Sequence, residues 1–161
     1  MVYLLTFRCY GTWLHGDERG SVDRFHNQPG EPLLGPDQRL HRYRKGLLKS
    51  GMAHLNENAR AVVDAAIHEA AASRSWTVQA LNVLSNHVHV VIECDEVVTA
   101  ERVLAYLKAR ATHHLRQKNL VTPDEKVWEY HGSTRYLKSA AAVTAACDYV
   151  LNQQDGEPRT Q

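Results

Sequence analysis

The order in which hydrophobic periodicity changes along the chain most constrains the fold of this sequence. Residues 3–13 alternate between apolar and polar side chains, which predicts a first β-strand. Asn56 precedes apolar residues at helical spacing, so we expect a helix from there to about Ser75. Two β-rich runs, 76–83 and 87–93, follow with only Leu-Ser-Asn between them, a pattern typical of a β-hairpin.

The second half of the chain repeats the alternation of helix and strand. Thr99 can cap a second amphipathic helix, and two short runs, 127–130 and 134–137, can supply edge strands. A third, alanine-rich helix is expected over 139–153. This order predicts an α+β fold of the ferredoxin-like split βαββαβ type, an antiparallel sheet with helices on one face and a C-terminal helix that carries Tyr149. The opposite face of the sheet is then open, and we expect the chemistry there.

The length of 161 residues suits a single domain. We expect that domain to span residues 1–156, with a long loop or insertion at 14–55 and a polar tail at 157–161. The longest apolar stretches are well short of the roughly 20 residues that span a membrane, and the first residues lack the features of a secretory signal, so we expect a cytoplasmic protein. The three cysteines lack Cys-x-x-Cys spacing and are expected to be reduced and mostly packed.

The charge of the chain is small in total but unevenly distributed. There are 19 lysines and arginines against 18 aspartates and glutamates, a formal net charge of +1. Residues 36–50 and 101–118 each hold five basic side chains and one acidic side chain, so the remainder is net acidic. Because charges act over about 8–10 Å at physiological salt, these two blocks can form a local phosphate-binding surface despite the nearly neutral total.

His87 and His89 lie two residues apart in the second β-rich run, so their side chains point to the same face of the strand. Two imidazoles at this spacing can bind one divalent cation. A metal site that acts on phosphate also keeps positions open for substrate oxygens and water. Taken alone, the pair is also explained by two polar rings that face solvent.

Tyr149 and Gln153 lie four residues apart in the third helix and therefore share a face. A tyrosine becomes a nucleophile when its proton is removed or its oxyanion is stabilised, and an amide oxygen can bind a hard cation. The structural alternative is a tyrosine that packs on the sheet, and Asn152 is a competing amide, although helical spacing favours Gln153. The inward face of this helix is expected to hold Val143, Cys147, Val150 and Leu151.

Two motifs resemble those of a known family. The segment NHVHVV at 86–91 resembles the His-hydrophobe-His (HUH) motif of the single-tyrosine HUH transposases, and DYVLNQ at 148–153 resembles their helix-borne catalytic tyrosine. The resemblance is greatest to the REP-associated tyrosine transposases and spans most of the chain, including LTFRCYGTWLHGDERGS, NHVHVVIE and WEYHGSTRYL. Many relatives follow the tyrosine with Asn-Pro and then glycine, whereas this chain has NQQDG.

The resemblance implies an enzyme that cleaves and joins single-stranded DNA as an endonuclease and strand-transferase, that is, a transposase. It implies that His87, His89 and Gln153 are ligands of Mg²⁺ or Mn²⁺. It also implies that Tyr149 is the catalytic nucleophile, which forms a covalent 5′-phosphotyrosine and leaves a free 3′-hydroxyl. The implied partner is single-stranded DNA with a hairpin, bound by a monomer or a homodimer, and no membrane.

Four cations are candidates for DNA binding. Arg8 lies on the first strand, and Arg102, Lys108 and Arg110 lie on the outer side of the second helix. Basic side chains contact phosphates and give affinity that falls with salt, whereas sequence choice needs base contacts or stacking. A solvated helix face explains the helical residues equally well.

Other functions fit parts of the same pattern. A non-catalytic module could bind single-stranded nucleic acid on the open face of a ferredoxin-like sheet. A domesticated transposase could process repeated hairpin elements. A zinc-dependent hydrolase could use His87, His89 and His131, although the chain has no His-Glu-x-x-His motif.

Overall fold

The computed structural model describes residues 1–11, 37–39, 42 and 54–154. Most of the predicted loop, most of the basic block at 36–50 and the whole polar tail lie outside the described residues, so these predictions stay predictions.

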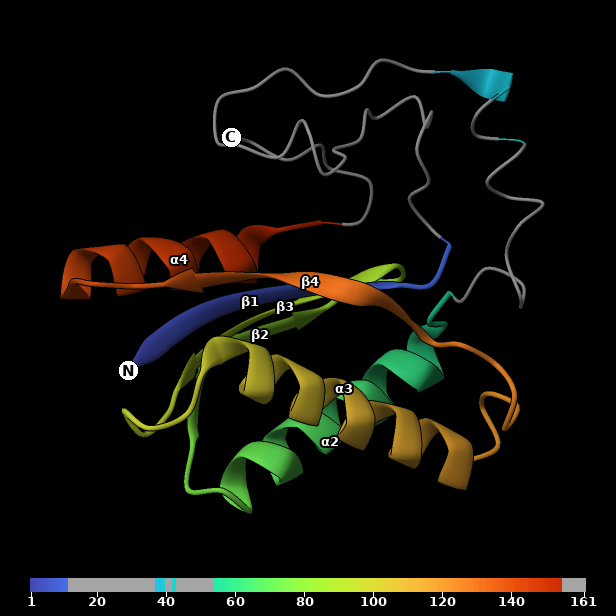
Figure 1. The fold of residues 1–161 in the computed structure, drawn as a ribbon, viewed down its shortest axis with the longest axis horizontal. Helices are drawn as coiled ribbons and strands as arrows, with labels where there is room; N and C mark the ends of the chain where they lie inside the picture. Colours follow the sequence, from blue (N-terminus) through green and yellow to red (C-terminus); the bar gives the residue numbers. More distant parts are fainter. Residues whose placement is uncertain (12–36, 40–41, 43–53, 155–161) are drawn as a thin grey trace.

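Four antiparallel strands form one sheet. These are β1 (Val2–Cys9), β2 (Thr77–Val83), β3 (His87–Glu93) and β4 (Trp128–Tyr136), arranged in the order β2-β3-β1-β4. The predicted hairpin joins β2 to β3, and β1 lies between β3 and β4 (Figure 1). This order confirms the predicted split βαββαβ arrangement.

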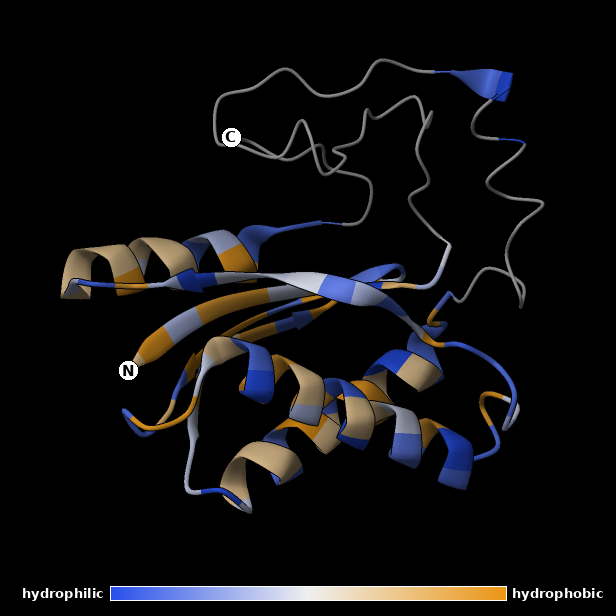
Figure 2. Ribbon diagram, in the orientation of Figure 1, coloured by the Kyte–Doolittle hydropathy of each residue, from blue (hydrophilic) through white to orange (hydrophobic). Residues whose placement is uncertain are grey.

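Two helices pack against one face of this sheet. They are α2 (Glu57–Ala72), whose N-cap is Asn56, and α3 (Ala100–Gln117), whose N-cap is Thr99; both caps accept a backbone N–H from the first turn, as expected. Figure 2 shows that apolar and polar residues are interspersed along α2 and α3, and almost all buried residues of both helices belong to the core shared with the sheet. Their apolar side chains form the main core with the inward side chains of the strands, whose fully buried members include Leu5, Phe7, Val63, Ile67, Val88, Val90, Ile92, Val103, Leu107 and Leu115.

The third helix lies on the other face of the sheet. Helix α4 (Ala140–Asn152) begins after the N-cap Ser139 and packs on β2 and β3, opposite α2 and α3 (Figure 1). The face that the sequence predicts to be open is therefore partly covered by the helix that carries the tyrosine. The prediction that Leu151 faces inward is wrong, because its side chain is 62% exposed. The second, smaller core contains Ala80, Val91, Leu137, Ala146 and Val150.

The two predicted edge strands are a single strand, β4. Its pairing with β1 shifts register between Phe7 and Cys9, and this irregularity explains why the sequence shows an interrupted pattern. Gly132 lies in the middle of the strand, where an added Cβ would be 2.7 Å from the Thr6 carbonyl oxygen and 2.8 Å from a Leu104 methyl carbon. A side chain at this position would push β4 away from both neighbours.

The cysteines are free thiols, as expected from their spacing. Cys9 and Cys94 are buried, and burial raises the pKa of Cys9 to about 12 and that of Cys94 to about 11. Cys147 on α4 is half-buried. In the described part of the chain, no helix is long and apolar enough to cross a membrane.

Candidate active site on the histidine face

The candidate site lies on the sheet face that α4 partly covers, which we call the histidine face. The strand registers place Thr6 of β1 and Asn82 of β2 on either side of His89, and Arg8 beside His87. Side chains of paired residues project from the same side of a sheet. Polar residues from three strands are therefore gathered on this face.

The two histidine rings are close together, as their spacing predicts. Their centroids are 4.7 Å apart and the ring planes are nearly perpendicular. His89 is buried, and its Nδ1 is hydrogen-bonded to the Thr6 hydroxyl at 2.8 Å. Nδ1 of His87 is hydrogen-bonded to the Asn86 side-chain oxygen.

These two hydrogen bonds bear on the tautomers of the rings. An amide oxygen only accepts, so Nδ1 of His87 carries the proton and the neutral ring has its lone pair on Nε2. The Thr6 hydroxyl can accept from His89 Nδ1 in the same way. Histidines that bind metals typically donate the N–H of the other nitrogen to an oxygen, which fixes ring orientation. The His87 ring therefore has the hydrogen bonding of a metal-binding imidazole, and the Thr6 hydroxyl allows the same tautomer at His89.

Tyr149 reaches the same place from α4. Its ring is half-buried, and the ring centroids of Tyr149 and His89 are 5.6 Å apart. The ring also packs in the second core, as the structural alternative anticipates. The fold thus brings together a histidine pair and a tyrosine that are 60 residues apart in the sequence.

Gln153 follows the last helical residue and is held near the sheet by β2. Its backbone is extended, so the helix ends one residue before the predicted boundary. The Asn82 amide donates to the carbonyl oxygens of both Val150 and Gln153, each at 2.8 Å. Gln153 is 9% exposed, whereas the exposed Asn152 turns its amide back to the Asp148 carbonyl oxygen. Of the two competing amides, only Gln153 is buried.

Among the described residues, the donor set includes two histidines and no third His, Cys, Asp or Glu side chain. Within the described residues, no group of three or more His, Cys, Asp or Glu side chains could hold a metal ion. His131 therefore does not complete a three-histidine zinc site with the pair. From the described part of the chain, the further ligands of a cation at His87 and His89 would be amide oxygens, with water or phosphate, and oxygen ligands suit Mg²⁺ and Mn²⁺.

The candidate DNA-binding residues divide between the two faces of the sheet. Arg8 lies on the histidine face, but Arg102, Lys108 and Arg110 lie on α3, which packs on the opposite face. Lys108 donates to the carbonyl oxygens of Glu129 and Tyr130, and burial lowers the pKa of its amine. Arg110 forms a 3.1 Å ion pair with Glu69. The structure does not bring these α3 cations to the histidine face.

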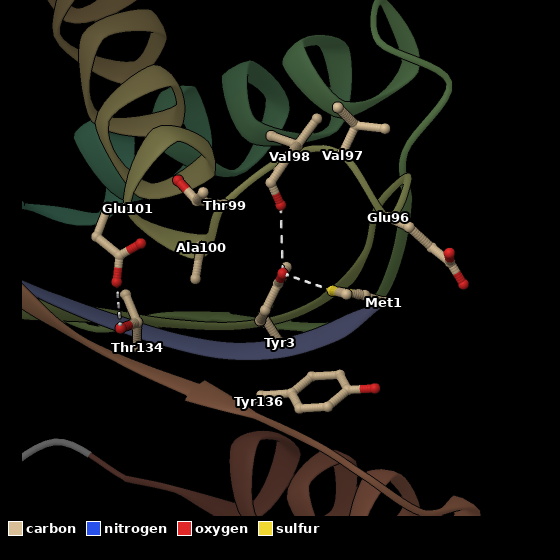
Figure 3. Close-up of a pocket in the computed structure, with 10 residues that line it drawn as sticks. All are labelled: Met1, Tyr3, Glu96, Val97, Val98, Thr99, Ala100, Glu101, Thr134 and Tyr136. Carbon is tan, nitrogen blue, oxygen red and sulfur yellow. Dashed lines mark hydrogen bonds between the residues drawn. The ribbon is translucent and has the colours of Figure 1, made fainter.

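A cavity of about 400 Å³ lies elsewhere, between the N-terminal end of α3 and the strands β1 and β4 (Figure 3). Tyr3 and Tyr136 form one side of it, and Glu101 is hydrogen-bonded to Thr134 at its edge. None of its lining residues belongs to the histidine and tyrosine cluster. The candidate active site is therefore a surface of the sheet and not this cavity.

Three residues of the site were not expected from the sequence: Thr6, Asn82 and Asn86. Thr6 alternates with buried residues of β1, so its face could be predicted, but its position beside His89 depends on the strand register. Asn86 directly precedes the histidine motif, which is the only local signal of its role. Asn82 contacts residues of α4 that are about 70 positions away, and no sequence pattern indicates this contact.

Comparison with known proteins identifies the family. Residues 42–153, well over half of the chain, match the family model of the IS200-like transposases. The chain therefore belongs to the IS200-like transposase family. No curated protein sequence matches it.

Two solved structures have a similar fold. One is a REP-associated tyrosine transposase bound to a REP hairpin, with a TM-score of 0.50, 13% identity and coverage of 92% of this chain. This chain spans 63% of the length of that transposase. The other is a protein from Deinococcus radiodurans R1 that was assigned as a transposase, with a TM-score of 0.53, 13% identity and coverage of 96% of this chain and 91% of that one.

Proposed function

We propose that this chain is a metal-dependent endonuclease and strand-transferase that cleaves single-stranded DNA through a covalent 5′-phosphotyrosine on Tyr149. The observation that best supports this function is the 5.6 Å separation of the Tyr149 and His89 rings, with His87 adjoining. Membership of a transposase family supports DNA as the substrate. The REP hairpin bound to one structural relative supports a hairpin within that substrate.

The residues would divide the work as follows. The Tyr149 phenol oxygen forms a bond to the scissile phosphorus, and the bond from phosphorus to the 3′ oxygen breaks. The proton lost by the phenol ends on the 3′-hydroxyl that leaves. Because one phosphodiester replaces another, no water is consumed, and a second 3′-hydroxyl can reverse the step and restore Tyr149.

Two histidines and one amide would hold the cation. We assign His87 and His89 as ligands through Nε2, since Nδ1 of each ring is hydrogen-bonded to Asn86 or Thr6. Gln153 is the proposed third ligand because it is the buried amide at the end of α4. When bound, Mg²⁺ or Mn²⁺ would neutralise charge that develops on the phosphoryl oxygens.

The proposal is tested with single-stranded hairpin DNA that is labelled at its 3′ end, the end that a 5′-phosphotyrosine retains, incubated with the protein and Mn²⁺. We expect a labelled protein band under denaturing conditions that requires the metal and is lost in Tyr149→Phe. Tyr130→Phe is the matched control, because Tyr130 is 81% exposed and lies near α3, away from the histidine face. An adduct that persists in Tyr149→Phe, or DNA binding without cleavage at any metal concentration, would contradict the proposal. The second outcome would favour a non-catalytic binding module.

A further inference from the structure

The histidine face continues beyond the histidine pair onto the edge strand β4. Ser133 is the register partner of Thr6, and Arg135 is the partner of Leu4, so both side chains project from the histidine face. Helix α4 packs on β2 and β3, on the other side of the site. Both Ser133 and Arg135 are exposed. The β4 edge of the face therefore carries exposed polar side chains near the candidate site.

Arg135 differs from Lys108 and Arg110, two of the three cations that the sequence singles out on α3. Within the described part of the chain, its guanidinium has no hydrogen bond, ion pair or ring contact. Lys108 is bonded to two backbone carbonyls and Arg110 to a carboxylate, so neither is available without breaking an internal contact. An exposed arginine with no internal partner keeps all five of its N–H donors for a ligand.

The charge on the β1–β4 half of the face favours an anion. Arg8 lies on β1 next to His87, and Arg135 lies across the face on β4. The carboxylate of Glu129 on β4 is committed to the backbone N–H of Gly11, at 2.7 Å. Asp148 is the nearest acidic residue in sequence to Tyr149 and is exposed on α4. Two guanidinium groups on this face, one beside His87 and one on β4, are complementary to a phosphodiester backbone.

The position of Arg135 sets which phosphate it can bind. Adjacent strands are about 4.8 Å apart, so β4 lies roughly 10 Å from β3 across the sheet. At that separation, Arg135 and the histidine pair would not bind the same phosphate. Arg135 would instead bind a phosphate further along the same DNA strand. A single DNA strand that crosses β1 would contact both the histidine pair and Arg135.

We propose that the β1–β4 half of the histidine face is the track for the DNA strand that flanks the scissile phosphate, and that Arg135 binds one flanking phosphate. This inference rests on the proposed function, because it assumes that the scissile phosphate lies at Tyr149. Arg135 is a positioning residue that fixes the register of the bound DNA strand on the sheet. It takes no part in bond making or breaking.

The test measures binding of the full-length protein to a fluorescent single-stranded oligonucleotide with EDTA present, so that no cleavage occurs. We expect Arg135→Gln to weaken binding about tenfold, the loss of one charge-assisted contact. We expect the slope of log affinity against log salt to fall by about 0.7, the value for one phosphate of a single strand. Arg74→Gln is the control, because Arg74 is an exposed arginine that lies over the Tyr106 ring on the opposite face of the sheet.

A second arm identifies the phosphate. Single neutral methylphosphonate linkages are placed at successive positions beside the cleavage site. In the wild-type protein, one flanking position should weaken binding, and that sensitivity should disappear in Arg135→Gln while sensitivity at other positions remains. A merely structural role for Arg135 would lower affinity at all positions alike.

The outcomes separate the two proposals. If Arg135→Gln binds like Arg74→Gln with an unchanged salt slope, the track is overturned even when Tyr149 forms an adduct. If the salt slope and the methylphosphonate pattern change as expected but no adduct forms, the track is supported and the nuclease function fails.

Discussion

Two hydrogen bonds to individual side chains determine how the histidine pair can bind a cation. Thr6 and Asn86 each bond to a ring at Nδ1, and both oxygens can accept the imidazole N–H. This arrangement favours the tautomer whose Nε2 can bind a cation. The chemistry of the pair therefore depends on side chains that are not themselves ligands or nucleophiles.

The hydroxyl of Thr6 is expected to support metal binding through His89. Thr6→Val keeps the shape of this buried side chain but removes the hydrogen bond, so the Mn²⁺ concentration for half-maximal adduct formation should rise about 10–100-fold. Thr6→Ser should restore most of the wild-type value because it keeps the hydroxyl. Equal Mn²⁺ dependence in all three proteins would show that His89 needs no partner at Nδ1.

Gly132 is expected to be required for packing. Gly132→Ala places a methyl group against the Thr6 carbonyl and Leu104, so either β4 or α3 must move. Such overpacking typically costs about 1–3 kcal/mol of the free energy of unfolding. Denaturant unfolding measures this cost, with exposed His131→Ala as the neighbouring control, for which the change should stay within about 0.5 kcal/mol. A Gly132→Ala protein as stable as the control would contradict the close approach.

At the scale of elements, α4 is attached to the sheet by a small core and by Asn82. The second core has five buried members, far fewer than the main core, and the Asn82 amide bonds the last turn to β2. Since β2 pairs with β3 at the histidines, this amide connects the position of Tyr149 to that of His89. The geometry of the site thus depends on the second core and on the Asn82 side chain that joins β2 to the end of α4.

Loss of the Asn82 amide should loosen the tyrosine helix. Asn82→Ala and Asn82→Asp both remove the donors to Val150 and Gln153, so we expect faster amide hydrogen exchange in the last turn of α4 and about tenfold slower adduct formation. Gln79→Ala is the control, because Gln79 lies on the same strand but bonds only to Glu93 among the described contacts. Unchanged exchange in the Asn82 variants would show that the second core alone holds the helix.

The sequence predicts the elements well because their signals are local. Alternation identifies β1 and β3, and the caps Asn56, Thr99 and Ser139 mark the helix starts. The two segments predicted in place of β4 were separated because its bulge interrupts the alternation. The prediction for Leu151 is wrong because the apolar stripe of α4 is broad, and its width does not indicate which edge of the stripe contacts the sheet.

The site was predictable only where residue type and spacing carry the information. The histidine pair and the tyrosine can be read from two short motifs. Arg135 could not be distinguished from the cations of α3, because the face on which it lies and the absence of a side-chain partner among the described residues depend on strand register and packing. A dense run of basic residues in sequence, as on α3, does not indicate which side of a sheet the helix will cover.

On the scale of the whole molecule, one chain supplies both the histidine pair and the tyrosine. A mixture of His89→Ala and Tyr149→Phe should therefore form no adduct, because neither variant has a complete site. The measurement is adduct formation in the mixture after joint refolding, with wild-type protein diluted by each variant as the control. Recovery of the adduct would show that Tyr149 acts on the histidines of a partner chain.

The most direct test of the account is the position of the covalent bond. After reaction with hairpin DNA and Mn²⁺, nuclease treatment leaves a nucleotide remnant on the protein, and peptide mapping by mass spectrometry locates it. We predict a remnant joined through phosphate to the peptide that contains Tyr149 and to no other tyrosine peptide. A remnant on another tyrosine, or cleaved DNA without any remnant on the protein, would contradict it.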